Sequence, residues 1–176
     1  MQEKLNLLDE YYRYYDIGDF KNSLMVLKKM EITTKDAAWI HAKCAECNYE
    51  LRKYKNAVEY CKKSLEIQNK YPLALWTLGN SFYYLKEYNN STEIFSTILK
   101  MTEFEIGKIE TKLGIQWARS LRMDSYLKMA DNLYMLCKDD EAKEALIQFN
   151  SIRKKGVLSC LPPNYIKAMR QNVNSL

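Results

Sequence analysis

The chain has 176 residues, which is enough for one compact domain with its own hydrophobic core. Hydrophobic residues make up 47% and charged residues 28%, a balance that excludes intrinsic disorder. No apolar run approaches the roughly 20 residues that a membrane span requires. Five cysteines at irregular spacing do not form a disulfide framework, so we expect a soluble, reduced, cytoplasmic protein.

A repeat of 34 residues begins near the N-terminus. The segments YYDIGDFKNSLMVLKKM, YELRKYKNAVEYCKKSL and YYLKEYNNSTEIFSTIL align at this spacing without a gap, and YMLCKDDEAKEALIQF is a fourth copy after an insertion of 17 residues. Apolar residues recur at helical spacing in each copy, which predicts two amphipathic helices joined by a tight turn. The predicted repeats cover residues 4–36, 38–71, 72–105 and 123–155 approximately.

Small residues recur at two positions of the repeat. The position in the first helix is occupied by Ala45, Gly79 and Ala130. The position in the second helix is occupied by Ser23, Ala57, Ser91 and Ala142. Small side chains allow two backbones to approach closely, so these positions predict antiparallel helix pairs.

The segment WTLGNSFYYLKEYNNSTEIF, residues 76–95, resembles the tetratricopeptide repeat (TPR) family. The resemblance depends on Leu78, Gly79, Phe82, Tyr88, Ser91 and Phe95. It implies an all-α fold, a TPR-like solenoid of helical hairpins wound into a right-handed superhelix, with residues 1–176 forming a single domain. It also implies that the first helix of each hairpin lines the concave face.

The segment 102–122 precedes the fourth repeat and lies outside the pattern. Its apolar residues are spaced as in a helix, which either extends the first helix of the fourth repeat or ends near Asp124, where that residue would cap the next helix. Gly156 is expected to end the last repeat helix, since Lys154 and Lys155 precede it. Residues 157–176 are expected to form a loop and a short capping helix.

His41, Cys44, Cys47 and Cys61 are candidates for a metal site. In the register of the repeat they fall on packing positions, and a regular helix does not supply the short cysteine knuckle of structural zinc sites. We therefore predict buried packing residues, with no metal and no cofactor. A lone histidine on a packing face is a poor general base, and no Gly-rich phosphate loop is present, so we predict no catalytic residues and no enzyme activity.

Aromatic residues recur at positions of the first helices that the resemblance places on the concave face. The predicted partner-binding residues are Tyr12, Tyr15, Trp39, Tyr49, Trp76, Asn80, Tyr83 and Tyr134. Aromatic rings with a polar tip provide a large contact area at low entropic cost, which suits the binding of a partner segment. A secondary candidate surface lies on the insertion at Trp117, Arg119 and Arg122.

These features predict a non-enzymatic protein–protein interaction module of the adaptor, scaffold or chaperone type. The alternative is an acidic-partner-binding or nucleic-acid-associated protein acting through its C-terminal segment, because the net charge of +5 arises after Glu144. No Asp or Glu follows Glu144, and the basic residues that do are Arg153, Lys154, Lys155, Lys167 and Arg170. Nucleic acid is the less favoured partner, since Tyr165 is the one aromatic residue after Phe149.

Overall fold

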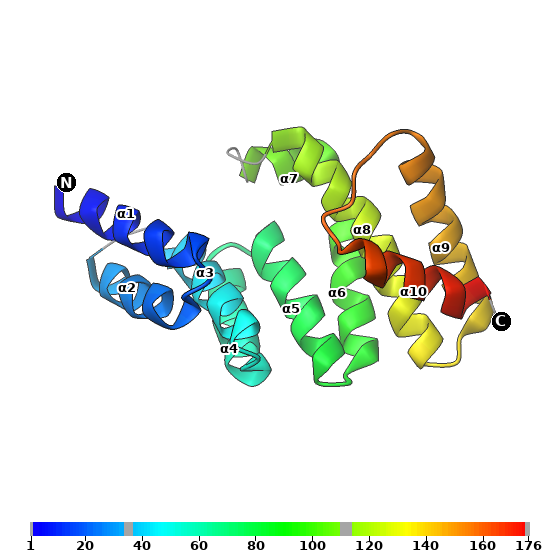
Figure 1. The fold of residues 1–176 in the computed structure, drawn as a ribbon, viewed down its shortest axis with the longest axis horizontal. Coiled ribbons are helices and arrows are strands. Elements are labelled where there is room, and N and C mark those ends of the chain that lie inside the picture. Colours follow the sequence, from blue (N-terminus) through cyan, green and yellow to red (C-terminus); the bar gives the residue numbers. More distant parts are fainter. Residues whose placement is uncertain (1, 34–36, 110–113, 175–176) are drawn as a thin grey trace. The chain divides into compact units, whose positions relative to one another are not determined.

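The computed structural model describes residues 2–33, 37–109 and 114–174, and in these ranges it consists of ten helices without a strand (Figure 1). The prediction of an all-α fold is confirmed. The chain divides into two compact units, with unit 1 ending at Leu85 and unit 2 beginning at Lys86. No helix in the described ranges is both long and apolar enough to cross a membrane.

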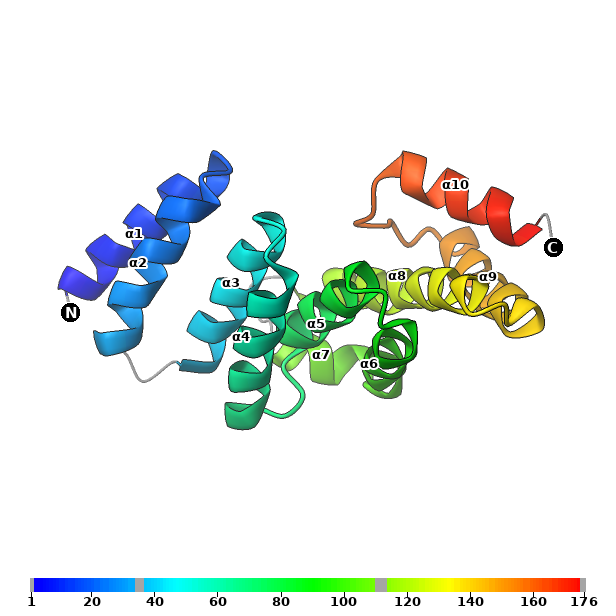
Figure 2. The same cartoon turned by 90° about the horizontal axis from the view of Figure 1, so that it is seen from below.

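Unit 1 is built from antiparallel hairpins. Its helices are α1 (Gln2–Asp16), α2 (Phe20–Thr33), α3 (Ala37–Glu50), α4 (Tyr54–Ile67) and α5 (Pro72–Tyr84). Helices α1 and α2 pair, α3 and α4 pair, and α5 packs against both members of the second pair (Figure 2). In the described residues, the first hairpin covers Gln2–Thr33 and the second Ala37–Ile67, where repeats were predicted at 4–36 and 38–71.

The small residues at the recurring position of the second helices are buried in both units. Ser23 and Ala57 in unit 1 are fully buried, as are Ser91 and Ala142 in unit 2. The neighbouring apolar column is buried with them, namely Leu27, Cys61, Phe95 and Leu146. The recurring positions of the sequence thus correspond to buried positions of the helices in both units.

The turns inside the hairpins share a backbone conformation with positive φ, although the residue type at this position differs from turn to turn. Gly18, Arg52, Lys86 and Cys137 all have positive φ, between 56° and 76°. At the first turn the Gly18 N–H donates to the Tyr15 carbonyl at 3.0 Å, and the next N–H donates to Tyr14 at 2.9 Å. The same two bonds occur at Arg52 and at Cys137. This is the Schellman ending of a helix, which favours glycine because other residues pay a steric cost there.

Glycine substitution at these turns is expected to stabilise the protein. Arg52→Gly and Cys137→Gly should each raise the free energy of unfolding by up to about 1 kcal/mol, since relief of the left-handed conformation exceeds the added chain entropy. Gly18→Ala should lower it by about 1 kcal/mol. Urea denaturation followed by circular dichroism measures both effects. Lys62→Gly, at an exposed interior position of α4, is the control and should be destabilising by about 1 kcal/mol.

Unit 2 contains the rest of the helices. They are α6 (Tyr88–Lys100), α7 (Glu103–Ile109), α8 (Gly114–Met135), α9 (Asp139–Lys154) and α10 (Pro163–Asn174). Helices α8 and α9 form the hairpin predicted at 123–155, and α6 and α7 both pack against α8. Gly156 has a φ of +85° just after α9, and the expected C-terminal helix is α10.

The insertion differs from the prediction in one respect. Of the two alternatives, extension of the first repeat helix is correct, because α8 runs without a break through Asp124, which therefore caps no helix. The earlier part of the insertion is the separate short helix α7. Thr102 begins it through a capping box, in which the Thr102 Oγ1 accepts from the Glu105 N–H at 3.1 Å and the Glu105 carboxylate accepts from the Thr102 N–H at 2.7 Å. Residues 110–113 of the insertion lie outside the described residues.

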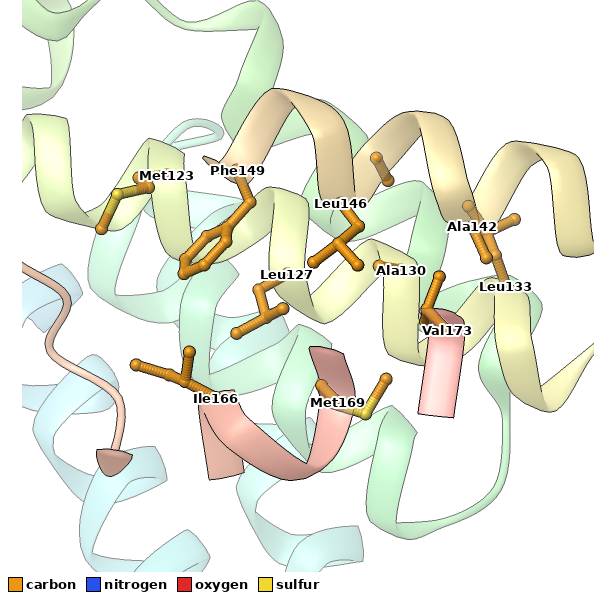
Figure 3. Packing of buried hydrophobic residues seen from close by; sticks show 11 residues of the cluster. Met123, Leu127, Ala130, Leu133, Ala142, Leu146, Phe149, Ile166, Met169 and Val173 are labelled. Atoms are coloured by element: carbon orange, nitrogen blue, oxygen red, sulfur yellow. The ribbon is translucent and has the colours of Figure 1, made fainter. Parts of the chain in front are cut away.

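The core of unit 2 joins α8, α9 and α10. Ile166, Met169 and Val173 of α10 belong to the same buried cluster as Leu127 of α8 and Phe149 of α9 (Figure 3). All of these side chains are at most 6% exposed. The terminal helix thus covers apolar surface that the α8–α9 hairpin would otherwise leave in water, as expected for a capping helix.

Candidate functional site: the first-helix face

Three predicted groove residues gather at the N-terminal end of unit 1, around the fully buried ring of Tyr11. The Tyr11 ring centroid lies 5.0 Å from Tyr12, 5.4 Å from Tyr15 and 5.7 Å from Trp39. The last contact joins α1 to α3. Tyr12, Tyr15 and Trp39 are half-buried, so each ring packs one side on the core and keeps part of its surface accessible.

Lys43 and Glu46 of α3 add charge to this aromatic cluster. The Lys43 Nζ lies 2.8 Å from a Glu46 carboxylate oxygen and 5.2 Å from the centroid of the Tyr15 ring. Burial, together with the charge of Glu46 and a hydrogen bond to it, raises the pKa of the Tyr15 hydroxyl, which therefore stays protonated. The predicted site did not include these charges, although opposite charges three residues apart on one helix face were the available signal.

A second aromatic cluster lies where α3, α4 and α5 meet. Tyr54 stacks on Tyr84 at 4.7 Å with the ring planes 5° apart, and Tyr49 meets both rings edge-on at 5.7 and 5.8 Å. Tyr83 contacts Tyr84 at 5.4 Å. Tyr84 is 49% exposed, so this cluster reaches solvent. Tyr49 and Tyr83 were predicted site residues, whereas Tyr54 and Tyr84 were missed because they lie outside the recurring column.

Asn80 is not available to a partner in the way the sequence suggested. Its side chain is 3% exposed, and its Nδ2 donates to the Trp76 carbonyl oxygen at 2.9 Å. The amide thus satisfies backbone of its own helix one turn earlier. Trp76 itself is half-buried. Tyr134, in unit 2, is also half-buried and packs against the core of α8, α9 and α10.

In unit 2 the corresponding face of α8 is covered by the C-terminal segment, residues 157–174. The Asp124 carboxylate accepts from the Ser159 hydroxyl at 2.5 Å and from the Cys160 N–H at 2.8 Å. One turn further along α8, the Lys128 Nζ lies 4.2 Å from the centroid of the Tyr165 ring. The Tyr165 hydroxyl donates to Asp131. Charges at i, i+4 and i+7 on a helix were the sequence signal for this contact, and the prediction missed it.

The repeat register relates the two faces. Asp124, Lys128 and Asp131 stand 85 residues after Trp39, Lys43 and Glu46, which is two repeats and the insertion. Asp124, Lys128 and Asp131 of α8 contact the C-terminal segment. The equivalent positions of α3 in the repeat carry an indole, a cation and a carboxylate.

Two residues of the secondary candidate surface form contacts with neighbouring helices of unit 2. Arg119 Nε lies 2.8 Å from a carboxylate oxygen of Glu103 in α7. Arg122 lies 3.8 Å from the same carboxylate group and donates to the Leu99 carbonyl of α6 at 3.4 Å. These contacts fasten α8 to its neighbours. Trp117, the third residue of this surface, is half-buried.

The cysteines around His41 pack in the core, as predicted. Cys44, Cys47 and Cys61 are fully buried and His41 is 8% exposed. Burial raises the pKa of Cys44 and of Cys47 to about 12, so both thiols are protonated at neutral pH and are poor ligands and nucleophiles. Among the residues that the structure describes, no group of three or more His, Cys, Asp or Glu side chains could hold a metal ion.

Known protein structures share this helical architecture. No protein-family model and no curated protein sequence matches the chain. A crystal structure of MamA matches with a TM-score of 0.68 and 16% identity, covering 87% of this chain and 80% of that one. TPR-like repeats of a putative kinesin light chain from Podospora anserina match with a TM-score of 0.66 and 16% identity, covering 99% and 86%. The TPR2B domain of yeast Sti1, in complex with pHsp70, matches with a TM-score of 0.56 and 14% identity, covering 71% and 97%. These likenesses, with the recurring hairpins and turns, identify the fold of this chain as that of the tetratricopeptide repeat proteins.

Proposed function

We propose that this protein is a non-enzymatic interaction module that binds a segment of a partner protein on the first-helix face of unit 1. That face comprises Tyr12, Tyr15, Trp39, Tyr49, Trp76 and Tyr83. The observation that carries the proposal is the C-terminal segment on α8, where Asp124, Lys128 and Asp131 hold a polypeptide at positions that repeat as Trp39, Lys43 and Glu46 in α3. The Sti1 structure, a complex with pHsp70, supports protein binding by this fold.

The chemistry of the face indicates the kind of segment. Half-buried tyrosines offer flat apolar surface with hydroxyl tips, and the carboxylates of Glu46 and Glu50 lie among them on α3. Lys43 neutralises Glu46, whereas Glu50 is exposed and forms no ion pair with another described residue. A segment with apolar side chains and a lysine or arginine fits this arrangement, because the cation can pair with Glu50 and lie over a tyrosine ring. In this proposal the protein acts as an adaptor, scaffold or chaperone in the cytoplasm, where its free cysteines remain reduced.

Photo-crosslinking in the native source tests the proposal and identifies the partner in the same experiment. We expect p-benzoylphenylalanine at Tyr15 or Tyr49 to crosslink one and the same protein, identified by mass spectrometry. The matched control is the same amino acid at Met25, a 54% exposed side chain on α2. Equal yield of that protein from Met25, or crosslinks to different proteins from Tyr15 and Tyr49, would refute a dedicated binding face.

A further inference from the structure

Unit 2 contains a hollow surface whose lining includes none of the residues of the proposed binding face. A cavity of about 620 Å³ lies between the end of α9, the loop after it and α10, with Arg153, Lys167 and Arg170 among its lining residues. A second cavity of about 450 Å³ shares Arg153 and Arg170 and adds Lys154. The shared arginines make the two cavities adjoining parts of one surface, which we call the α9–α10 cleft.

The charge of the α9–α10 cleft is uniform. Its four basic side chains are exposed, and none forms an ion pair with another described residue. Arg153 and Lys154 lie in the last turn of α9, where cations are favourable beside the helix dipole. Lys167 and Arg170 lie within α10, one turn apart, where the dipole gives no such reason. A concentration of like charge without a counter-charge attracts an anionic ligand.

The lining of the cleft is also apolar. Val157 and Leu161 pack on the core of unit 2, and Ile166 of that core also lines the cleft. Leu158 also lines the cleft, and its side chain is 81% exposed. An exposed leucine beside arginines matches a ligand that carries both carboxylates and a bulky apolar side chain.

Nucleic acid fits this surface less well than an acidic protein segment does. Binding of single strands relies on bases stacked on accessible aromatic rings. Tyr165 is the one aromatic residue after Phe149, its hydroxyl donates to Asp131, and its ring faces Lys128. The arginines, by contrast, suit carboxylates, which a guanidinium group can bind through two parallel hydrogen bonds.

We propose that the α9–α10 cleft binds an acidic segment of a partner protein that carries a leucine or phenylalanine. Its carboxylates pair with Arg153, Lys167 and Arg170, and its apolar side chain packs against Leu158 and Ile166. This site shares no residue with the first-helix face, so in this proposal the chain has two binding surfaces, one for a basic segment and one for an acidic segment.

Selection from a random peptide display library tests the proposal. The full chain is the target, and peptides that also bind the double variant Arg153→Gln, Arg170→Gln are removed. Both arginines are exposed, so this variant keeps the fold. We expect the recovered peptides to be enriched in Asp and Glu together with Leu or Phe. An empty selection, or peptides without an excess of acidic residues, overturns the proposal.

Fluorescence anisotropy with the most enriched peptide, labelled with fluorescein, separates a site from general charge attraction. Affinity should fall about tenfold or more in the double arginine variant, the loss expected for removing charge-assisted hydrogen bonds. It should stay unchanged in Lys55→Gln, Lys62→Gln, which removes the same charge from exposed positions of α4. Equal losses of affinity in the two double variants overturn the proposal. It is also overturned if the protein binds the enriched peptide no more tightly than it binds a version with glutamine in place of glutamate, or than it binds oligothymidylate. Tyr49→Ala should leave this affinity unchanged, which keeps the result independent of the first-helix face.

Discussion

Phe149→Ala should be among the most destabilising substitutions in unit 2, lowering the free energy of unfolding by about 3–5 kcal/mol. Phe149 is fully buried in α9, and its ring lies among side chains from α8 and α10 (Figure 3). Truncation removes the largest fully buried side chain of that core and leaves a cavity, which the three surrounding helices cannot fill by shifting inward. Urea denaturation monitored by circular dichroism gives the loss, and hydrogen exchange with mass spectrometry should place it in α8, α9 and α10.

The matched control for this prediction is another phenylalanine in the same unit. Phe104 in α7 is 71% exposed, so Phe104→Ala should change stability by no more than about 0.5 kcal/mol. A loss below about 1 kcal/mol for Phe149→Ala would show that the core of α8, α9 and α10 is not packed as described.

Asp124→Asn should remove a pH dependence from the stability of unit 2. Burial raises the pKa of Asp124 to about 6, although the hydrogen bonds from Ser159 and Cys160 and the charge of Lys128 oppose this rise. The unfolded value is about 3.8, so between these two pH values the folded state binds the proton more tightly than the unfolded state. Stability from this group is therefore present at low pH and is lost as pH rises through about 6.

The size of the effect follows from the same two values. The separation of the two pKa values corresponds to on the order of 3 kcal/mol. On acidification from about pH 7 to about pH 4, the free energy of unfolding of the wild-type protein should therefore rise by about that much more than that of the asparagine variant. An asparagine can still accept from the Cys160 N–H and donate to the Ser159 hydroxyl, so the variant should keep the C-terminal segment in place. Unfolding midpoints in urea at the two pH values provide the measurement.

A second aspartate separates this effect from general acid titration. Asp140 is exposed in the first turn of α9, so Asp140→Asn should retain the wild-type pH dependence. If Asp124→Asn and Asp140→Asn behave alike, the C-terminal segment does not depend on the Asp124 carboxylate.

The fold could be anticipated because its signal is periodic and local. Ser23, Ala57 and Ser91 recur at the repeat spacing, Ala142 takes the same position after the insertion, and all four are buried. Gly156 marked the end of α9 for a similarly local reason, since its φ of +85° is unfavourable for other residues. At Asp124 the pattern left two alternatives, a continuous helix or a boundary capped by this residue, and the structure shows the continuous helix. Burial of Leu121 and Leu127 on either side outweighs the capping preference of Asp124 and keeps α8 continuous.

The candidate site was less accessible to sequence reasoning. The recurring tyrosines Tyr15, Tyr49 and Tyr83 were visible as a column, but their neighbours were not. Tyr54 stacks on Tyr84 from a different helix, and Asn80 turns its amide to its own backbone. Such choices depend on side-chain contacts across helices, which a spacing of residues along one helix does not encode.

By itself, the sequence of this protein determined the helical hairpins, the register of their buried small and apolar columns, and the basic character of the C-terminal end. Each of these features depends only on the types of residues and on their spacing within a few turns of helix. The tertiary structure alone decided that residues 157–174 lie on α8, and that Arg153 and Arg170 line one cleft. The Asp124–Ser159 and Asp131–Tyr165 hydrogen bonds join residues 35 and 34 positions apart in the chain. Such contacts depend on how the helices pack around a shared core. Burial of Ile166, Met169 and Val173 fixes the position of α10, and this also places its polar side chains against α8.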